Sequence, residues 1–319
     1  MKYYKNKKII FRFDIGNFDG FGHYKRSSAF IEFLIKKKFS VTICTNRPSI
    51  KFLNKKFKKK VFVKKSKENE EKFLNRVSKT FEGNIIIIDK IYSYKKNSIE
   101  NLKKKNDVIF FQNNSVGSKI ADKVIFPDDH TKKFTSDKRY FFGSKYLAVR
   151  DEILRIKKVR SYNYLGINFG GSDPFGITIK VAKILKKLEW DKKTIFFIGK
   201  DFKDKKKLSF LIKDIKNFYI KKFDIKSLFE SKLLITSFSI ITYEISHLSK
   251  LNLVITLNKT IKLPKTKFLK NVINLGFYKN LSNNLIYKNL NKYWNLERKK
   301  LNYRIKTNAN KKLLDILKN

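Results

Sequence analysis

The sequence predicts an α/β fold made of two Rossmann-like domains facing across a cleft. Short apolar segments typical of buried parallel strands alternate with segments whose apolar residues recur at helical spacing. Glycine-containing loops follow a strand and precede a helix at two places, 16–22 and 170–174. The length of 319 residues also suits two domains of ordinary size. Two consecutive α/β domains leave a cleft between their carboxyl-end loops, which is a usual place for a ligand.

The first domain is expected to span residues 1–156. The run Ile85 to Ile88 is wholly apolar and ends in Asp89, which is typical of a central parallel strand covered on both faces. The other strands and short apolar runs expected here are 9–11, 39–45, 61–63, 107–111 and 123–126, and the helices are 24–38, 68–81 and 98–105.

The second domain is expected to span residues 157–319. Its strands are predicted at 162–169, 194–198, 218–220, 233–236 and 253–257, with a helix at 177–188 and another beginning near Ser239. The segment 289–319 is typical of a basic helical tail, which we assign to the same domain.

The loop after the first strand is the predicted catalytic region. Gly20 and Gly22 allow a ligand to approach the backbone closely, and His23 lies beside them at the start of a helix. Because the positive end of the helix dipole disfavours imidazolium, we expect a neutral ring that can accept a proton near pH 7. The alternative is a histidine that only caps the turn.

Two segments of the second domain are candidates for nucleotide binding. Gly170, Gly171 and Ser172 form a tight turn after a strand, which either contacts a ligand through its backbone or is only a connection. Ser239 and Ile240 begin a helix whose free amides suit a diphosphate. Glu244 follows just over one turn later, within reach of a ribose, unless it is only an exposed helix residue.

The composition restricts the function classes. The net charge of +48 suggests nucleic acid or an anionic surface, but the lysines are spread evenly along the chain instead of forming a binding stripe. The single cysteine, Cys44, excludes a disulfide framework and favours a reducing compartment. No apolar run reaches membrane-spanning length, so we expect a cytoplasmic protein with no membrane span. No histidine spacing indicates a metal site, and no cofactor is expected.

Four motifs in order resemble the UDP-sugar hydrolases of pseudaminic acid biosynthesis and the related spore-coat polysaccharide proteins. The motifs are Phe11-Arg12-Phe13-Asp14 with Gly20-Phe21-Gly22-His23-Tyr24-Lys25-Arg26, then Tyr146 to Glu152, Gly170 to Pro174, and Ser237-Phe238-Ser239 with Tyr243-Glu244. They cover most of the chain up to about Gly276. The first motif is the most specific of the four.

The resemblance implies a GT-B architecture, similar to the glycosyltransferase that makes the lipid-linked peptidoglycan precursor. It implies metal-independent hydrolysis of a UDP-linked diacetamido-trideoxy sugar, with His23 as the general base. Glu244 is then the ribose-binding carboxylate. The residues that would contact the sugar or the diphosphate are Arg12, Asp14, Gly20, Gly22, Arg26 and Tyr92.

The sequence departs from this family near the expected sugar pocket. Lys90 and Ile91 stand where the hydrolases present a His-Tyr pair, which makes Tyr92 the nearest candidate. Gln112, Asn113 and Asn114 replace acidic residues, and Ser239 replaces a small glycine. Two other functions therefore stay open: a glycosyltransferase in which His23 activates an acceptor hydroxyl, and a basic module that binds nucleic acid or an anionic surface.

Overall fold

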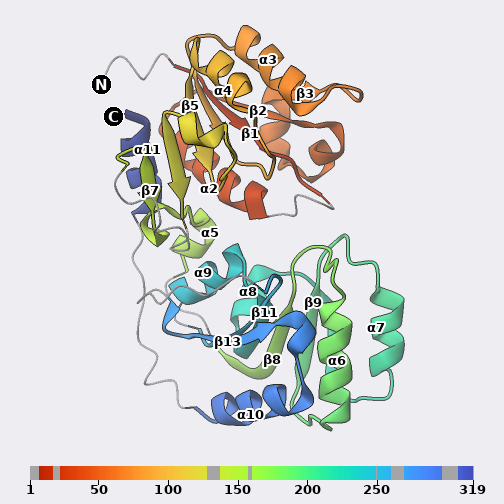
Figure 1. Ribbon diagram of the computed structural model, residues 1–319. Coiled ribbons are helices and arrows are strands. Elements are labelled where there is room, and N and C mark those ends of the chain that lie inside the picture. Colours follow the sequence, from red (N-terminus) through yellow and green to blue (C-terminus); the bar gives the residue numbers. More distant parts are fainter. Residues whose placement is uncertain are drawn as a thin grey trace. The chain divides into compact units, whose positions relative to one another are not determined.

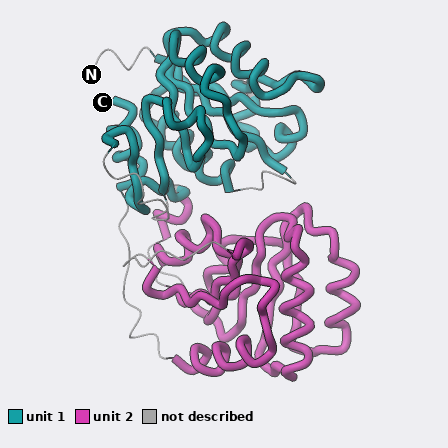
Figure 2. Tube along the Cα trace, in the orientation of Figure 1, with its two compact units in different colours: residues 1–151, 307–319 teal, residues 152–306 magenta. Residues whose placement is uncertain are grey.

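The computed structural model divides into two compact units, which are Met1–Asp151 with Thr307–Asn319 and Glu152–Lys306 (Figure 2). The structure describes residues 7–16, 22–127, 137–156, 160–248, 250–259, 269–296 and 308–318. The division lies close to the junction expected at 156/157. The last helix belongs to the first unit, whereas the sequence analysis assigned the whole tail to the second domain.

The first unit is a seven-stranded parallel sheet in the order β3-β2-β1-β4-β5-β6-β7 (Figure 1). Its strands are β1 (Ile9–Arg12), β2 (Val41–Asn46), β3 (Val61–Lys64), β4 (Ile85–Ile88), β5 (Asp107–Phe111), β6 (Lys123–Phe126) and β7 (Tyr140–Phe142). Its helices are α2 (Gly22–Lys36), α3 (Glu70–Thr80), α4 (Lys96–Lys103) and α11 (Ala309–Lys318). Short 3-10 turns are η1 (Arg47–Phe52), η2 (Lys55–Lys60), η3 (Ser118–Ile120) and η5 (Ser144–Tyr146), and α5 (Asp151–Leu154) lies at the division between the units.

Strand β4 shows why this sheet is buried on both faces. Ile85 and Ile87 pack with residues of α2 and α11, whereas Ile86 and Ile88 pack with residues of α3 and α4. Side chains of a strand alternate between the two faces, so a wholly apolar run is required where helices cover both. The prediction of a central parallel strand at 85–88 is confirmed.

Helix α11 completes one of these two layers. Leu313 and Leu317 are buried in the same cluster as Phe30 and Leu34 of α2. The ammonium group of Lys123 in β6 also donates a hydrogen bond to the carbonyl oxygen of Ile316. The final helix is therefore part of the core of the first unit.

The second unit is a six-stranded parallel sheet in the order β10-β9-β8-β11-β12-β13. Its strands are β8 (Tyr162–Asn168), β9 (Thr194–Ile198), β10 (Phe218–Lys222), β11 (Ser231–Ser237), β12 (Asn252–Thr256) and β13 (Val272–Phe277). Its helices are α6 (Ile177–Lys187), α7 (Lys205–Ile212), α8 (Ile225–Phe229), α9 (Ile240–His247) and α10 (Asn283–Trp294), with the 3-10 turn η7 (Tyr278–Asn280).

Both sheets have the strand order 3-2-1-4-5-6 of a Rossmann fold, with β7 added to the first. The predicted α/β fold class with two Rossmann-like domains is therefore confirmed. In such a sheet the order reverses between the first and fourth strands, and ligands bind outside the carboxyl ends of those two strands. The reversal falls between β1 and β4 in the first unit and between β8 and β11 in the second.

Candidate active site

The reversal point of the first sheet brings His23 to Asp89. His23 is the second residue of α2, which follows β1, and Asp89 comes directly after β4. Nδ1 of His23 lies 2.6 Å from Oδ1 of Asp89. Both side chains are buried, and the histidine is 9% exposed. Among the described residues, Nε2 of His23 makes no hydrogen bond.

Asp89 is held from several sides. Nε of Arg26 donates to Oδ2 at 3.0 Å, Nη2 of Arg26 donates to Oδ1, and the hydroxyl of Ser27 donates to Oδ2 at 2.8 Å. Arg26 and Ser27 follow His23 by one turn of α2, which places them on the same side of the helix. The carboxylate is therefore fixed by the helix that carries the histidine.

The charge state of Asp89 fixes the proton of the His23 ring. Burial alone would raise the pKa of Asp89, but the charge of Arg26 and the hydrogen bonds from His23 and Arg26 oppose burial and lower the pKa to about 2. An ionised carboxylate only accepts hydrogen bonds, so Nδ1 carries the proton that joins the two side chains. The lone pair of Nε2 is then available to accept a proton.

A second buried cluster lies on the other face of the sheet and contains Arg12 and Asp14. The Arg12 side chain is fully buried and binds the carboxylate of Asp14 at 2.5 and 2.7 Å and that of Glu70 at 2.7 and 2.6 Å. Lys90 adds an ion pair of 2.8 Å to Asp14. Burial alone would raise the pKa of Asp14, but Arg12 and Lys90 hold it well below its usual range. This geometry favours Arg12 as a group that positions two carboxylates.

Tyr92 lies in a loop that the next strand holds in place. The amide nitrogen of Asn113 donates to the carbonyl oxygens of Lys90 and Tyr92 at 3.1 and 2.9 Å. The Tyr92 ring packs edge-on against Tyr94, with ring centroids 4.8 Å apart, and Tyr92 remains 36% exposed. The loop that begins at Asp89 is therefore fixed by hydrogen bonds from the next strand, and it presents the partly exposed ring of Tyr92.

The glycine turn of the second unit is closely packed. Gly170 has a φ of 88°, and its amide donates to the side-chain oxygen of Asn168 at 3.1 Å. A Cβ atom on Gly199, at the end of β9, would lie 2.2 Å from the carbonyl oxygen of Gly171. Asp173 accepts hydrogen bonds from the amides of Ile177 and Thr178 at 3.0 and 2.7 Å, which fixes the start of α6. Ser172 lies half-buried within this turn.

Helix α9 begins at the reversal point of the second sheet. Ser239 is its N-cap, and the amide of Ser239 donates to the hydroxyl of Thr242 at 3.2 Å. The amides of Ile240 and the following residue start the helix, where no intrahelical acceptor exists. Glu244 is 3% exposed, so it is not the exposed helix residue that was the alternative.

The structure brings together some of the predicted residues and separates others. His23 and Arg26 both bind Asp89, while Arg12 binds Asp14 and also Glu70. Gly22 begins α2, where a Cβ atom would meet no described atom within 4 Å. Gly20 lies outside the described residues. The roles in substrate and nucleotide binding that we assigned from sequence stay predictions.

Sequence reasoning missed Asp89 and Gln112 as members of the site. A carboxylate directly after a wholly apolar strand was the available signal for Asp89, because side chains at that place reach the carboxyl edge of a parallel sheet. No sequence signal indicated that the side-chain oxygen of Gln112 accepts a hydrogen bond from Nη1 of Arg26.

The two Rossmann-like sheets match the GT-B fold. MurG of Acinetobacter baumannii is similar in structure with a TM-score of 0.62 and 12% identity, over 98% of this chain and 99% of that one. UDP-GlcNAc 2-epimerase of Methanocaldococcus jannaschii, in complex with UDP-GlcNAc and UDP, has a TM-score of 0.61 and 15% identity, over 98% of this chain and 99% of that one. An α-glucosyltransferase in complex with UDP and DNA has a TM-score of 0.54 and 12% identity, over 98% of this chain and 99% of that one.

At the level of sequence, the chain is similar to the uncharacterized protein MJ1062 of Methanocaldococcus jannaschii, with 31% identity over 153 residues. This match covers 42% of this chain and 31% of the relative, so the chain spans about a third of that protein. No family model matches the sequence.

The described residues show neither a membrane-spanning helix nor a cluster of metal ligands. No helix in those parts of the chain is both long and apolar enough to cross a membrane. Within the same ranges, no three His, Cys, Asp or Glu side chains gather in a way that could hold a metal ion.

Proposed function

We propose that the chain is a nucleotide-sugar enzyme that hydrolyses a UDP-sugar, with His23 as the general base. The observation that carries this proposal is the 2.6 Å contact between Nδ1 of His23 and Asp89 at the reversal point of a Rossmann-like sheet. A carboxylate that binds one ring nitrogen sets the tautomer and leaves the other nitrogen to take a proton. A histidine that only caps a turn does not require such a partner.

The proposed step transfers a proton from water to Nε2 of His23. The water oxygen forms a bond to the anomeric carbon, while the bond between that carbon and the β-phosphate oxygen of UDP breaks with its electron pair. UDP leaves and the sugar is released with inverted configuration. Asp89 lies against the imidazolium that forms and stabilises its charge, whereas Arg26 opposes an additional positive charge before the reaction.

The second unit supplies the groups that hold UDP in this proposal. The first amides of α9, from Ile240 onward, suit the diphosphate because helix N-termini carry partial positive charge, and Ser239 is the N-cap beside them. The carboxylate of Glu244 accepts hydrogen bonds from the ribose hydroxyls. Gly170, Gly171 and Ser172 provide backbone contacts after β8. The UDP named for two structural neighbours supports a uridine nucleotide as the ligand.

The finer substrate class follows the sequence resemblance. It is a UDP-linked diacetamido-trideoxy sugar such as UDP-2,4-diacetamido-2,4,6-trideoxy-β-L-altropyranose, used for a nonulosonic acid or a surface polysaccharide. The exposed ring of Tyr92 supports such a substrate, since an aromatic face packs well against deoxy and acetamido methyl groups.

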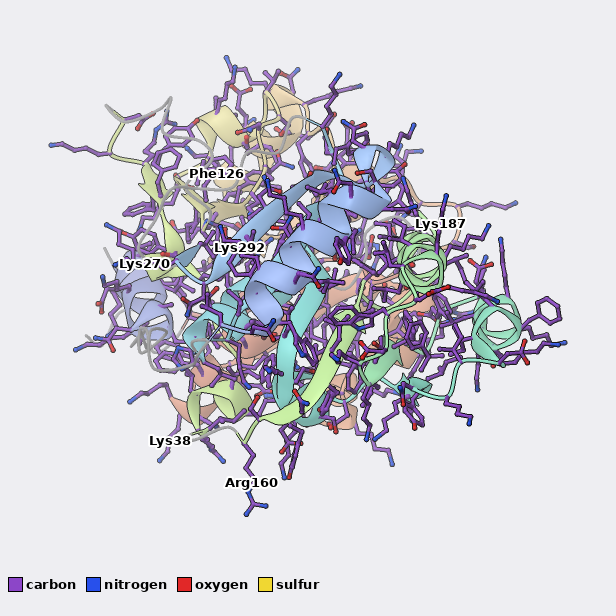
Figure 3. All side chains as sticks on the ribbon, turned by 90° about the horizontal axis from the view of Figure 1, so that it is seen from below. Lys38, Phe126, Arg160, Lys187, Lys270 and Lys292 are labelled. Atoms are coloured by element: carbon purple, nitrogen blue, oxygen red, sulfur yellow. The ribbon has the colours of Figure 1, made fainter. Side chains whose placement is uncertain are left out.

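Glycosyl transfer is the second candidate function. The same base would then deprotonate an acceptor hydroxyl, and the structural likeness to an α-glucosyltransferase favours this alternative. The nucleic-acid alternative has less support. Among the basic residues of the second unit that Figure 3 labels, Lys187 comes from α6, Lys292 from α10, and Arg160 and Lys270 from segments between elements.

The deciding experiment incubates the purified protein with a panel of UDP-sugars and follows both UDP and the sugar product. Free sugar plus UDP without an acceptor supports hydrolysis, and UDP release only with an added acceptor supports transfer. The His23→Ala protein is the control, with turnover expected to fall by about 10²- to 10⁴-fold and UDP affinity unchanged. Near-wild-type turnover in that variant would reject His23 as the base.

A further inference from the structure

We infer that Gln112 is a positioning residue for the His23 base, and this inference rests on the proposed function. Gln112 directly follows β5, and β5 is the neighbour of β4 in the sheet. Its side-chain oxygen accepts a hydrogen bond from Nη1 of Arg26. Arg26 in turn holds Asp89, and Asp89 holds His23. The four side chains thus form one chain of contacts that ends at Nδ1 of His23, on the ring whose Nε2 is the reacting nitrogen.

The backbone of Gln112 supports a specific role. Its φ is 48°, in the left-handed backbone region that residues other than Gly, Asn and Asp rarely adopt. Its amide is tied to the carbonyl oxygen of Ile125 on β6 at 2.9 Å, so the sheet edge holds this turn in place. Such a conformation is strained and persists where the surroundings over-determine it, as they do at many functional sites.

The direction of the Arg26 fork explains what Gln112 does. Nε and Nη2 of Arg26 face the Asp89 carboxylate, and Nη1 faces Gln112. Nη2 also lies 3.3 Å from Nδ1 of His23, where two donors cannot bond each other. Without an acceptor for Nη1, the guanidinium can rotate and bring its charge against the ring. Gln112 therefore keeps the Arg26 guanidinium on the Asp89 carboxylate. Nδ1 of His23 is then free of the Arg26 charge and bonds only to Asp89.

The chain allows a direct test because it contains three histidines, which makes the imidazole ¹⁵N spectrum simple to assign. The test variant is Gln112→Gly, because glycine accepts a φ of 48° and the substitution removes the side chain that carries the acceptor oxygen. In the wild type we expect His23 to show a single tautomer with the proton on Nδ1. In the variant we expect a mixture of both tautomers, with a thermal unfolding midpoint no lower than that of the wild type, because glycine adopts the positive φ without strain.

The rescue variant is Gln112→Glu, which restores an acceptor oxygen at the same distance from the backbone. We expect it to return His23 to the single Nδ1-protonated tautomer. A wild-type His23 spectrum in Gln112→Gly would overturn the inference, and so would a failure of Gln112→Glu to restore the spectrum.

These measurements need no substrate, so they distinguish the inference from the proposed function. If the protein releases no UDP from any sugar but the spectra change as expected, the function fails and the positioning role stands. With an active substrate, Gln112→Gly should lower kcat by about tenfold and leave KM within about twofold, because the effect acts on the base and not on binding.

Discussion

Oδ1 of Asp89 and Nδ1 of His23 lie 2.6 Å apart, although 66 residues separate them in the chain. Strands β1 and β4 pair in parallel with Arg12 opposite Ile88, so the residues that follow these strands meet at one edge of the sheet. Their contact is a consequence of the strand register, and the base depends on a partner that a different strand supplies.

Replacing Asp89 by asparagine should impair the base without removing its hydrogen bond. The amide presents an NH₂ group as readily as an oxygen, so it stabilises the tautomer in which Nδ1 accepts and Nε2 carries the proton. Turnover should fall at least about tenfold. Steady-state kinetics of UDP release measures this. The control is Ser27→Ala, which removes one hydrogen bond from an uncharged donor to the same carboxylate. Equal losses in both variants would contradict the tautomer argument.

Glu244→Ala should weaken nucleotide binding through loss of the ribose contacts. Hydrogen bonds to a charged group contribute about 1.5–3 kcal/mol, so the Kd for UDP should rise by about 10- to 100-fold. Isothermal titration calorimetry with UDP measures the change. Asp214→Ala removes an exposed carboxylate from the same unit and serves as the control. Unchanged UDP affinity in the Glu244 variant would count against the ribose assignment.

Acid should destabilise the protein through Asp89. Its pKa in the folded state is about 2, against about 3.9 in the unfolded chain, so its stabilising contribution is present above pH 4 and is lost as the pH falls towards 2. The contribution is about 2–3 kcal/mol. Urea unfolding of the wild type and Asp89→Asn at several pH values checks this. The gap in unfolding free energy should narrow between pH 4 and pH 2, and a constant gap would contradict the lowered pKa.

Cys44 should react slowly with thiol reagents while the first unit is folded. Burial in β2 raises the pKa of its thiol to about 12, against the smaller opposing effect of the Arg12 and Arg76 charges, so almost no thiolate exists at pH 8. Labelling with a chromogenic disulfide should become fast only in urea. Because the sequence has a single cysteine, the labelling rate reports opening around β2. Fast labelling in buffer would show that this strand opens readily.

Local sequence predicted the elements well, because apolar runs and helical spacing report directly on burial. The run 85–88 is a four-residue strand covered on both faces, as expected. Strand β7 was not predicted, since three residues carry too little periodicity. The partners within the site were harder to predict. The burial of Arg12 depends on Glu70, which comes from α3, and the turn at Gln112 has no glycine to indicate its positive φ. Both are products of tertiary packing.

The return of α11 to the first unit bears on how the protein is made. The leucines that close the layer beside α2 leave the ribosome after the whole of the second unit, whereas the strands that they cover leave it before that unit. The amino-terminal half therefore waits with an uncovered apolar face while the other half, a continuous stretch of chain, is free to fold first. A stop codon before residue 308 would leave that face without its cover permanently.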